Sequence, residues 1–254
     1  MRFASLGSGS QGNATLVSCE GDMLLIDCGF SLRELQARMH RLGAEPSGLS
    51  AILVTHEHSD HIRGVWPVAR KYGLPVYLTS GTHASGRLGK LPDIRVIEPP
   101  GRFEVGGFTI APVAVAHDAA EPSQFVFYRQ GKKLGLLTDL GSITASVLEA
   151  YQGCDALLVE ANHDPIMLAS GPYPPSLKRR VAGQWGHLSN AQTMSLLEQL
   201  DTSRLQHLVI GHISQTNNSI CRAAAALEGI LPQLPIHYAC QNQGFDWLTL
   251  HDNF

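Results

Sequence analysis

The sequence predicts an α/β protein, and more specifically a four-layer αββα sandwich in which two sheets pack face to face and helices cover their outer faces. Two observations lead to this fold class. Strand-like runs are dense in the first half of the chain, and strands alternate with helix-like segments in the second half. Hydrophobic residue types make up 44% of the 254 residues, which is enough for a sizeable core. Because no linker-like change in composition divides the chain, we expect one domain over residues 1–254.

The strand predictions rest on short apolar or alternating runs bounded by turn residues. In the first half of the chain they cover Arg2–Leu6, Ala14–Cys19, Met23–Asp27, Ala51–Val54, Val76–Thr79, Arg95–Ile97, Phe108–Val115, Phe125–Arg129 and Lys132–Leu137. The last two are joined by Gln130-Gly131, which predicts a hairpin turn. In the second half, strands are predicted over Ala156–Glu160 and His207–Ile210, and two more close the chain.

The helix predictions rest on apolar residues at helical spacing. Leu32, Leu35 and Met39 recur in this way behind Ser31, a residue type that caps helix N-termini, and predict a helix over residues 31–42. Later helices are predicted over Ala145–Tyr151, Asn190–Leu200 and Ser219–Leu231. Prolines interrupt residues 164–186, where we expect a loose segment.

Composition excludes several classes of protein. A formal net charge of -3 argues against a bulk electrostatic attraction to nucleic acid. The same net charge is compatible with a local basic surface. No apolar run approaches the ~20 residues that a membrane span needs, and the N-terminus lacks the pattern of a secretory signal. We therefore expect a cytoplasmic protein without a membrane segment. Five cysteines with no C-x-x-C pair predict buried, reduced thiols.

Metal-binding residue types gather directly after the strand that ends near Thr55. Three imidazoles and a carboxylate fall within six residues, at His56, His58, Asp60 and His61. Imidazole and carboxylate ligands together suit zinc, manganese or iron. Because a turn at the end of a strand can direct these side chains into one cleft, the segment predicts a metal site.

This segment resembles the H-x-H-x-D-H motif of the metallo-β-lactamase superfamily, and further motifs of that superfamily follow in order. His117 comes after a strand, Asp139 after a hairpin, and His212 at the end of a late strand. The resemblance covers nearly the whole chain and implies the metallo-β-lactamase fold.

The resemblance also implies a dinuclear metal centre. One ion would be held by His56, His58 and His117, the other by Asp60, His61 and His212, and Asp139 would bridge the two. The expected cofactors are two divalent ions, Zn²⁺ or Mn²⁺, and iron is also compatible. Two such ions share and activate a hydroxide, and Asp60 would accept a hydrogen bond from it.

A carboxylate–histidine pair narrows the resemblance to the phosphodiesterase branch typified by ribonuclease Z. Glu160 ends a strand without being one of the seven ligands, and His187 precedes a helix. In that branch the Glu orients the His, which serves as proton donor or oxyanion partner near the leaving group. The chemistry is reasonable because a sugar alkoxide is a poor leaving group until it is protonated.

Four further runs stand out: GSGSQGNA (7–14), EANHD (160–164), GHISQTNN (211–218) and QNQG (241–244). Together these runs are similar to the WalJ group, also called YycJ, whose members are described as metal-dependent 5′ to 3′ DNA exonucleases or simply as metallohydrolases. Ser8, Asn13, His163 and Asn217 within them are candidates for contacting the substrate or supporting the ligands. A structural hydrogen bond is an equal alternative for His163. The glycine-rich run is either a phosphate-binding loop or a plain turn, and Lys178-Arg179-Arg180 contacts phosphate or is a solvated face.

The sequence thus predicts a dinuclear-metal phosphodiester hydrolase, with nucleic acid or another phosphodiester as its substrate and 5′–3′ DNA exonuclease as its activity. The alternatives within the superfamily are a thioester or lactone hydrolase and a hydrolase of small cyclic phosphodiesters. A scaffold without activity is disfavoured because all seven ligands are present, and an iron oxidoreductase because position 58 is His. The identity of the metal, the choice between DNA and RNA, and the oligomeric state stay open.

Overall fold

Fourteen strands, nine α-helices and one short 3₁₀ helix lie within residues 1–252, the part of the chain that the computed structural model describes. The strands are β1 Arg2–Gly7, β2 Ala14–Cys19, β3 Asp22–Ile26, β4 Ala51–Leu53, β5 Val76–Thr79, β6 Ile94–Ile97, β7 Phe103–Val105, β8 Phe108–Ala114, β9 Ser123–Arg129, β10 Lys132–Leu137, β11 Ala156–Glu160, β12 His207–Gly211, β13 Ile236–Tyr238 and β14 Phe245–Thr249. The α-helices are α1 Leu32–Arg41, α2 Ser59–Ile62, α3 Val65–Tyr72, α4 Ser80–Ala84, α5 Ala145–Tyr151, α6 Pro165–Ser170, α7 Pro175–Val181, α8 Asn190–Gln199 and α9 Ile220–Ala226, and the 3₁₀ helix η1 is Pro46–Gly48.

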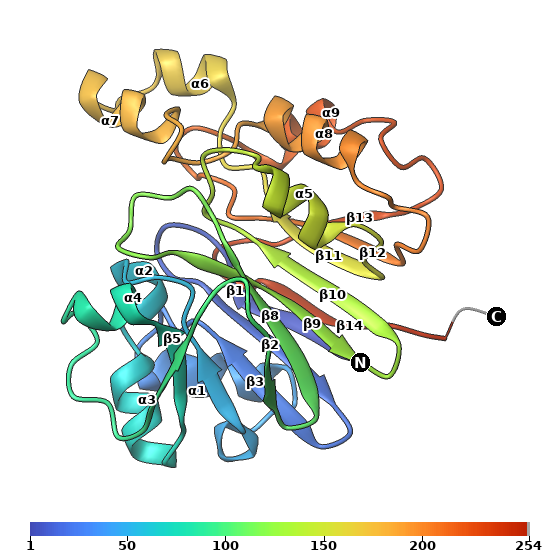
Figure 1. Ribbon diagram of the computed structural model, residues 1–254. Coiled ribbons are helices and arrows are strands. Elements are labelled where there is room, and N and C mark those ends of the chain that lie inside the picture. The colour runs from blue at the N-terminus through green and yellow to red at the C-terminus, as the bar shows by residue number, and fades with distance from the viewer. Residues whose placement is uncertain (253–254) are drawn as a thin grey trace.

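The strands form two mixed seven-stranded sheets that pack face to face (Figure 1). The first sheet has the order β14-β1-β2-β3-β4-β5-β6, and the second has the order β13-β12-β11-β10-β9-β8-β7. Neighbours are parallel from β3 to β6 and from β10 to β13. The two closing strands separate, because β13 joins the second sheet and β14 returns to pair with β1.

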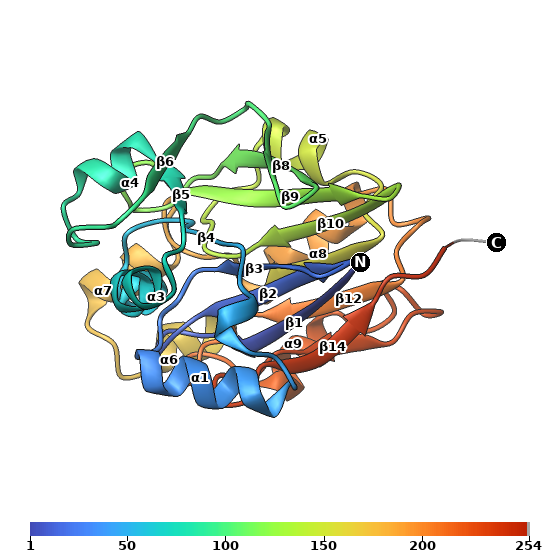
Figure 2. The same cartoon turned by 90° about the horizontal axis from the view of Figure 1, so that it is seen from below.

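Three apolar layers hold the four-layer arrangement together. Between the sheets lie the side chains of Phe3, Phe125 and their neighbours, which are fully buried. A second layer joins the first sheet to α1 and α3, where Leu35 and Val68 are buried. The third joins the second sheet to α5, α8 and α9; Figures 1 and 2 show these helices on the opposite side of the molecule from α1 and α3. No helix within residues 1–252 combines the length and apolarity that crossing a membrane requires.

The topology brings the ends of several strands to one edge. Strands β8, β10, β11 and β12 all run in the same direction within the second sheet, so their carboxyl ends share an edge. In the first sheet β4 leads into the segment that begins at His56. Ligand sites of α/β proteins form at the carboxyl ends of strands, and this edge carries the candidate site.

Two local predictions are confirmed in detail. Ser31 caps α1 in a capping box, in which its hydroxyl accepts a hydrogen bond from the Glu34 backbone N–H and the Glu34 carboxylate accepts one from the Ser31 N–H. Gln130 and Gly131 join β9 to β10 with φ values of 52° and 70°. Two residues of positive φ in sequence are what a two-residue hairpin turn requires.

The expectation of a loose segment over residues 164–186 is wrong. This segment holds α6 and α7, which begin at Pro165 and Pro175. Proline is tolerated in the first helical turn, where its missing N–H has no helical partner in any case. The short helices α2, α3 and α4 and the strand β7 were not predicted, and the last helix ends at Ala226 instead of Leu231. All five cysteines are free, but Cys221 is exposed and Cys240 half-buried, so only three are buried as expected.

Candidate active site

The segment after β4 presents alternate side chains to one cleft. His56 is fully buried, His58 caps the start of α2, and Asp60 and His61 lie in its single turn. The imidazole rings of His56 and His58 have centroids 4.5 Å apart, and those of His56 and His61 are 4.2 Å apart. The strand therefore ends in a cluster of rings that is already assembled.

The second sheet completes the first predicted trio of ligands. His117, which follows β8, is 2% exposed, and its ring centroid lies 4.9 Å from that of His56 and 5.0 Å from that of His58. Ligand nitrogens of these three residues lie within 4.8 Å of one another. One ion can reach all three, so the structure brings the predicted trio together.

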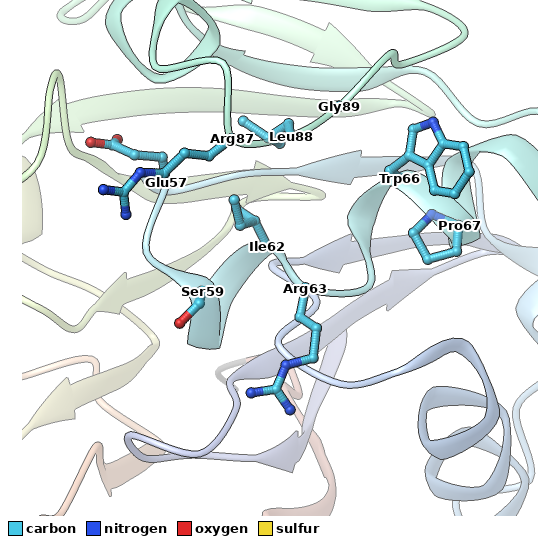
Figure 3. Close-up of a pocket in the computed structure, with 9 residues that line it drawn as sticks. All are labelled: Glu57, Ser59, Ile62, Arg63, Trp66, Pro67, Arg87, Leu88 and Gly89. Atoms are coloured by element: carbon cyan, nitrogen blue, oxygen red, sulfur yellow. The ribbon is translucent and has the colours of Figure 1, made fainter.

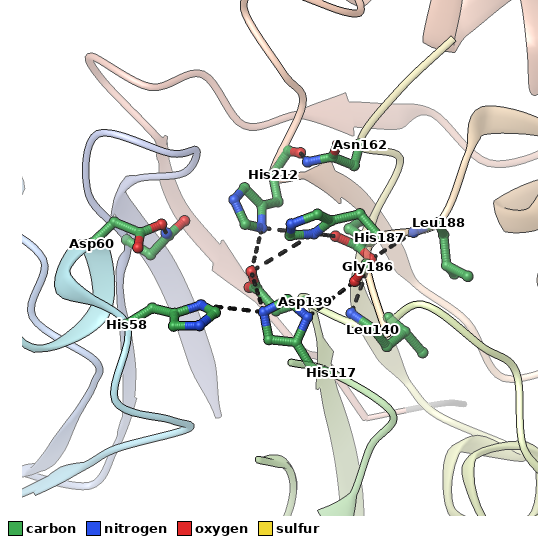
Figure 4. Close-up of polar contacts among 12 residues, drawn as sticks. His58, Asp60, His117, Asp139, Leu140, Asn162, Gly186, His187, Leu188 and His212 are labelled. Atoms are coloured by element: carbon green, nitrogen blue, oxygen red, sulfur yellow. Dashed lines mark hydrogen bonds and ion pairs between the residues drawn. The ribbon is translucent and has the colours of Figure 1, made fainter. Parts of the chain in front are cut away.

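Asp139 lies at the centre of the cluster (Figure 4). It follows β10 in the left-handed conformation, with φ 55°, and is 2% exposed. Its carboxylate oxygens lie 3.0 Å from His212 Nδ1, 3.5 Å from His61 Nε2 and 4.0 Å from His117 Nε2. Burial opposes its ionisation, but the imidazoles of His212 and His61 hold the pKa of this carboxyl well below its usual range.

The second predicted trio is more widely spread than the first. Asp60 Oδ2 lies 3.6 Å from His61 Nε2, whereas the rings of His61 and His212 are 6.1 Å apart. Asp139 fills the space between these two rings and contacts both. Through Asp139 the three side chains belong to the same cluster.

The donor set fits divalent metal ions. His56 Nε2 and Asp139 Oδ2 are buried without a hydrogen-bond partner, which is costly unless another group pairs with them. Burial also holds the pKa of His56 well below its ordinary value, so its imidazole is neutral, as a metal ligand must be. Burial opposes the charged form of His61, but the carboxylates of Asp139, Asp27 and Asp60 outweigh it and raise the pKa of His61 well above its ordinary value. Binding of a cation at His61 therefore releases a proton.

The outward nitrogens of three rings are fixed by hydrogen-bond partners. His56 Nδ1 lies 2.9 Å from Thr55 Oγ1, and His117 Nδ1 lies 3.0 Å from the Gly186 carbonyl oxygen. His61 Nδ1 lies 2.7 Å from Asp27 Oδ2. Such contacts set the tautomer and direct the other ring nitrogen inwards. Sequence reasoning missed Asp27, although an acid directly after an apolar strand is the same signal that singled out Glu160.

The predicted pair of Glu160 and His187 is in contact. Glu160 is fully buried, and its Oε2 lies 3.1 Å from His187 Nδ1. Its Oε1 accepts hydrogen bonds from the backbone N–H groups of Leu140 and Leu188 (Figure 4). Burial opposes the charged imidazolium, but the Glu160 carboxylate outweighs it and raises the pKa of His187 to about 9. Because Nδ1 is taken by Glu160, Nε2 is the nitrogen left to act in the cleft.

Ser8 and Asn13 contact predicted ligand residues and do not line the pocket that opens over the cluster. The Ser8 hydroxyl accepts a hydrogen bond of 2.8 Å from the backbone N–H of His212. Asn13 Nδ2 lies 3.3 Å from Asp60 Oδ2 and 3.1 Å from His61 Nε2, and both Asn13 side-chain atoms also bond the backbone of Gly9. The glycine-rich run thus folds back against the ligands.

His163 and Asn217 lie outside the cleft. His163 is buried, pairs with Ser189 through an isolated β-bridge, and has no partner for Nδ1. Asn217 is 1% exposed, and its backbone carbonyl accepts a hydrogen bond from the Asp164 N–H. Neither lines the pocket over the metal ligands, so no substrate contact is assigned to them.

A pocket of ≈ 250 Å³, which we call the metal-side pocket, opens over the cluster of candidate ligands. Its lining includes residues that the sequence did not single out. Asp118 Oδ1 lies 3.7 Å from His58 Nε2 and 3.5 Å from His117 Nε2. Arg180 on α7 pairs with the Asp118 carboxylate, and Tyr173 lines the same wall. Asp118 directly follows His117 in the sequence, which is a usable signal, whereas the approach of Arg180 depends on the path of α7.

Comparison with known proteins gives a consistent family. Residues 23–213 match the family model described as a beta-lactamase superfamily domain. The chain is 36% identical over 222 residues to the exodeoxyribonuclease YycJ of Bacillus anthracis, an overlap that covers 86% of this chain and 84% of that one. A shorter stretch of 64 residues, 22% of this chain and 21% of the other, is 47% identical to ribonuclease Z of Mycobacterium sp. (strain KMS).

A solved structure confirms the fold class. Zn²⁺-bound PqqB from Methylobacterium extorquens superposes with a TM-score of 0.72 at 19% identity, covering 98% of this chain and 100% of that one. The αββα sandwich predicted from the sequence is therefore the fold of this molecule.

Proposed function

Because this chain belongs to the beta-lactamase superfamily and is a hydrolase of that superfamily, we propose that it cleaves phosphodiester bonds of nucleic acid as a metal-dependent 5′–3′ DNA exonuclease. The observation that carries the proposal is the bond between Glu160 and His187, placed beside the cluster of ligand residues. The name of the YycJ relative, which is similar over most of both chains, supports DNA as the substrate.

The proposal assigns seven residues to two divalent ions, with Asp139 between them. His56, His58 and His117 would hold one ion, and Asp60, His61 and His212 the other. Bound Zn²⁺ or Mn²⁺, or iron, would supply a nucleophile from water at neutral pH and neutralise charge that develops on the phosphoryl oxygens. Asp60, whose side chain is 21% exposed at the edge of the cleft, would accept a hydrogen bond from the attacking water.

His187 is assigned the role of general acid. With its pKa raised to about 9, the imidazolium is the main form near neutral pH, and Nε2 has a proton to donate to the leaving sugar oxygen. Glu160 holds the ring by Nδ1 and is itself fixed by two backbone N–H groups, so the ring does not need to reorient for the transfer. A leaving alkoxide needs this proton far more than a stabilised anion does.

Thioester hydrolysis fits the same ligands but does not explain this pair. A thiolate leaves without protonation, so such an enzyme has no need for a buried Glu that fixes an imidazolium. The geometry therefore favours phosphodiester cleavage over thioester hydrolysis. Lactone opening also expels an alkoxide, and against it the proposal rests on the name of the YycJ relative.

The test is a panel of substrates offered to the purified protein with Mn²⁺ or Zn²⁺. We expect release of nucleotides from the 5′ end of labelled DNA, and loss of that release in EDTA. Arms with 3′-labelled DNA, RNA and bis-p-nitrophenyl phosphate separate polarity, sugar and simple diester hydrolysis. Hydrolysis of a thioester or lactone with no cleavage of any diester would overturn the proposal.

A further inference from the structure

A second pocket, of ≈ 390 Å³, lies on the outer side of the ligand-bearing segment (Figure 3). It is lined by Glu57, Ser59, Ile62, Arg63, Trp66, Pro67, Arg87, Leu88 and Gly89. Nothing in the function proposed above uses this pocket. Its lining combines one large aromatic side chain, two guanidinium groups and an apolar floor of Ile62 and Leu88.

This pocket and the metal-side pocket share a wall. His58 and Asp60 face the metal-side pocket, while Glu57 and Ser59, which alternate with them along the chain, face the outer pocket. The start of α2 and the residues just before it therefore lie between the two pockets. The neighbouring nucleotides of a chain-like substrate cleaved in the metal-side pocket therefore have a path into the outer pocket.

The surroundings of the outer pocket are basic in a chain that is acidic overall. Residues 61–92 contain no Asp or Glu, although the chain has 22 of them. They contain five exposed cations, Arg63, Arg70, Lys71, Arg87 and Lys90. Within residues 1–252, the ion pairs made by Arg and Lys side chains involve none of these five. Guanidinium groups without an ion-pair partner in a segment that contains no acid are suited to phosphate, although Glu34, outside this segment, interacts electrostatically with Arg63.

Glu57 is the one acid that lines the pocket; one of its carboxylate oxygens is paired with the backbone, and the other, Oε2, is buried without a hydrogen-bond partner. Glu57 is 7% exposed, and its Oε1 accepts a hydrogen bond of 2.8 Å from the backbone N–H of Ala120. In Figure 3 Glu57 stands at the end of the pocket away from Trp66 and Pro67. Its charge is therefore not directed at the aromatic end.

Trp66 is held in place with part of its ring open to solvent. Its indole N–H donates a hydrogen bond of 3.0 Å to the Lys90 carbonyl oxygen, and the Arg70 guanidinium carbon lies 5.4 Å from the ring centroid. The side chain nevertheless remains on the surface, at 37% exposure. An exposed, fixed indole among cations is the pattern of a base-stacking platform in proteins that bind single strands.

Resting on the proposed function, we propose that this pocket binds a nucleotide of a single nucleic-acid strand, next to the phosphodiester that is cleaved. Trp66 stacks on the base, and Arg63 and Arg87 contact the phosphates on either side. The local basic segment provides the attraction that a net charge of -3 does not. The strand continues from here into the metal-side pocket, across the shared segment.

The test measures binding of a 5′-fluorescein-labelled single strand to the metal-loaded protein by anisotropy, with phosphorothioate linkages to prevent cleavage. Trp66→Ala is expected to weaken binding by about 5- to 100-fold, whereas Trp66→Phe keeps most of the affinity because a phenyl ring also stacks. Arg63→Gln and Arg87→Gln should each lower the slope of log K against log salt by about 0.7. Arg2→Gln, the same change of charge at the far end of β1, should leave both affinity and slope unaltered.

The outcomes separate this inference from the proposed function. Wild-type affinity in Trp66→Ala, equal losses in Trp66→Ala and Trp66→Phe, or an unaltered salt slope in the arginine variants would overturn the pocket assignment, even if the wild-type protein degrades DNA. A duplex that binds as tightly as the strand, with the same dependence on Trp66, would overturn it as well. Strand binding that depends on Trp66, in a wild-type protein that cleaves no diester, would support the pocket and refute the nuclease.

Discussion

At the scale of single residues, Asp139 decides whether the cluster is one site or two. Its carboxylate oxygens lie within 4.0 Å of nitrogens from His212, His61 and His117, and one oxygen has no hydrogen-bond partner. Asp139→Ala should abolish activity and reduce the metal content from two ions per chain by at least one, as read by elemental analysis. Cys154→Ser, a buried change outside the cluster, should retain both ions. A wild-type content at or below one ion after reconstitution would contradict the dinuclear assignment.

Burial alone predicts how the cysteines react. It raises the pKa of Cys28 to about 12 and that of Cys154 also to about 12, so at pH 8 roughly one thiol in 10⁴ is ionised. Cys221 is exposed. Iodoacetamide should therefore label Cys221 within minutes and leave Cys28 and Cys154 unmodified until the protein is denatured. Peptide mapping by mass spectrometry checks this, and rapid labelling of Cys28 in the folded protein would show that the core around it opens.

At the scale of elements, the ends of strands carry the chemistry. Asp27 follows β3, and its carboxylate accepts hydrogen bonds from the Thr55 N–H and hydroxyl and contacts His61 Nδ1 at 2.7 Å. Asp27→Asn suits the left-handed backbone there but removes the charge, and should weaken metal binding by about 10- to 100-fold. Ser31→Ala, at the start of α1, should instead cost about 1 kcal/mol of unfolding free energy and leave metal affinity unaltered. Metal titration measures the affinity, and urea unfolding measures the free energy of unfolding. Wild-type metal affinity in Asp27→Asn, or weakened metal binding in Ser31→Ala, would contradict the role given to Asp27.

The same scale shows how far the sequence can predict the site. Period-two and period-three-to-four patterns locate most strands and helices. Motif residues at strand ends predict that seven candidate ligands, Glu160 and His187 lie close together. All of them except Asp60 belong to the groups whose polar atoms lie within 4.8 Å of one another, and Asp60 lies 3.6 Å from His61. The helices α6 and α7 do not follow from the pattern because proline usually interrupts a helix, whereas here it occupies the first position of both. Arg180 reaches Asp118 only through the placement of α7, and such contacts between distant segments follow from tertiary packing.

At the scale of the whole molecule, we propose that residues 1–254 form one cooperative domain. The layer between the sheets joins the two halves of the chain, and β14 returns from the second half to pair with β1. Thermal unfolding should therefore show one transition, with circular dichroism and tryptophan fluorescence coinciding. Each ion present at 100 times its Kd should add about 2.7 kcal/mol of stability, so EDTA should lower the Tm. Two separate transitions, or a Tm that is insensitive to EDTA, would contradict this account.

We propose that Glu160 and His187 serve the leaving group of a phosphodiester, and the rates of one variant on two substrates test this role. His187→Ala should keep both metal ions yet slow the cleavage of DNA by ~10²–10⁴-fold, the usual contribution of general acid catalysis. Hydrolysis of bis-p-nitrophenyl phosphate should fall much less, because p-nitrophenolate leaves without a proton, and Glu160→Gln should show a milder form of the same difference. Equal losses on both substrates, or loss of a metal ion in His187→Ala, would contradict the account.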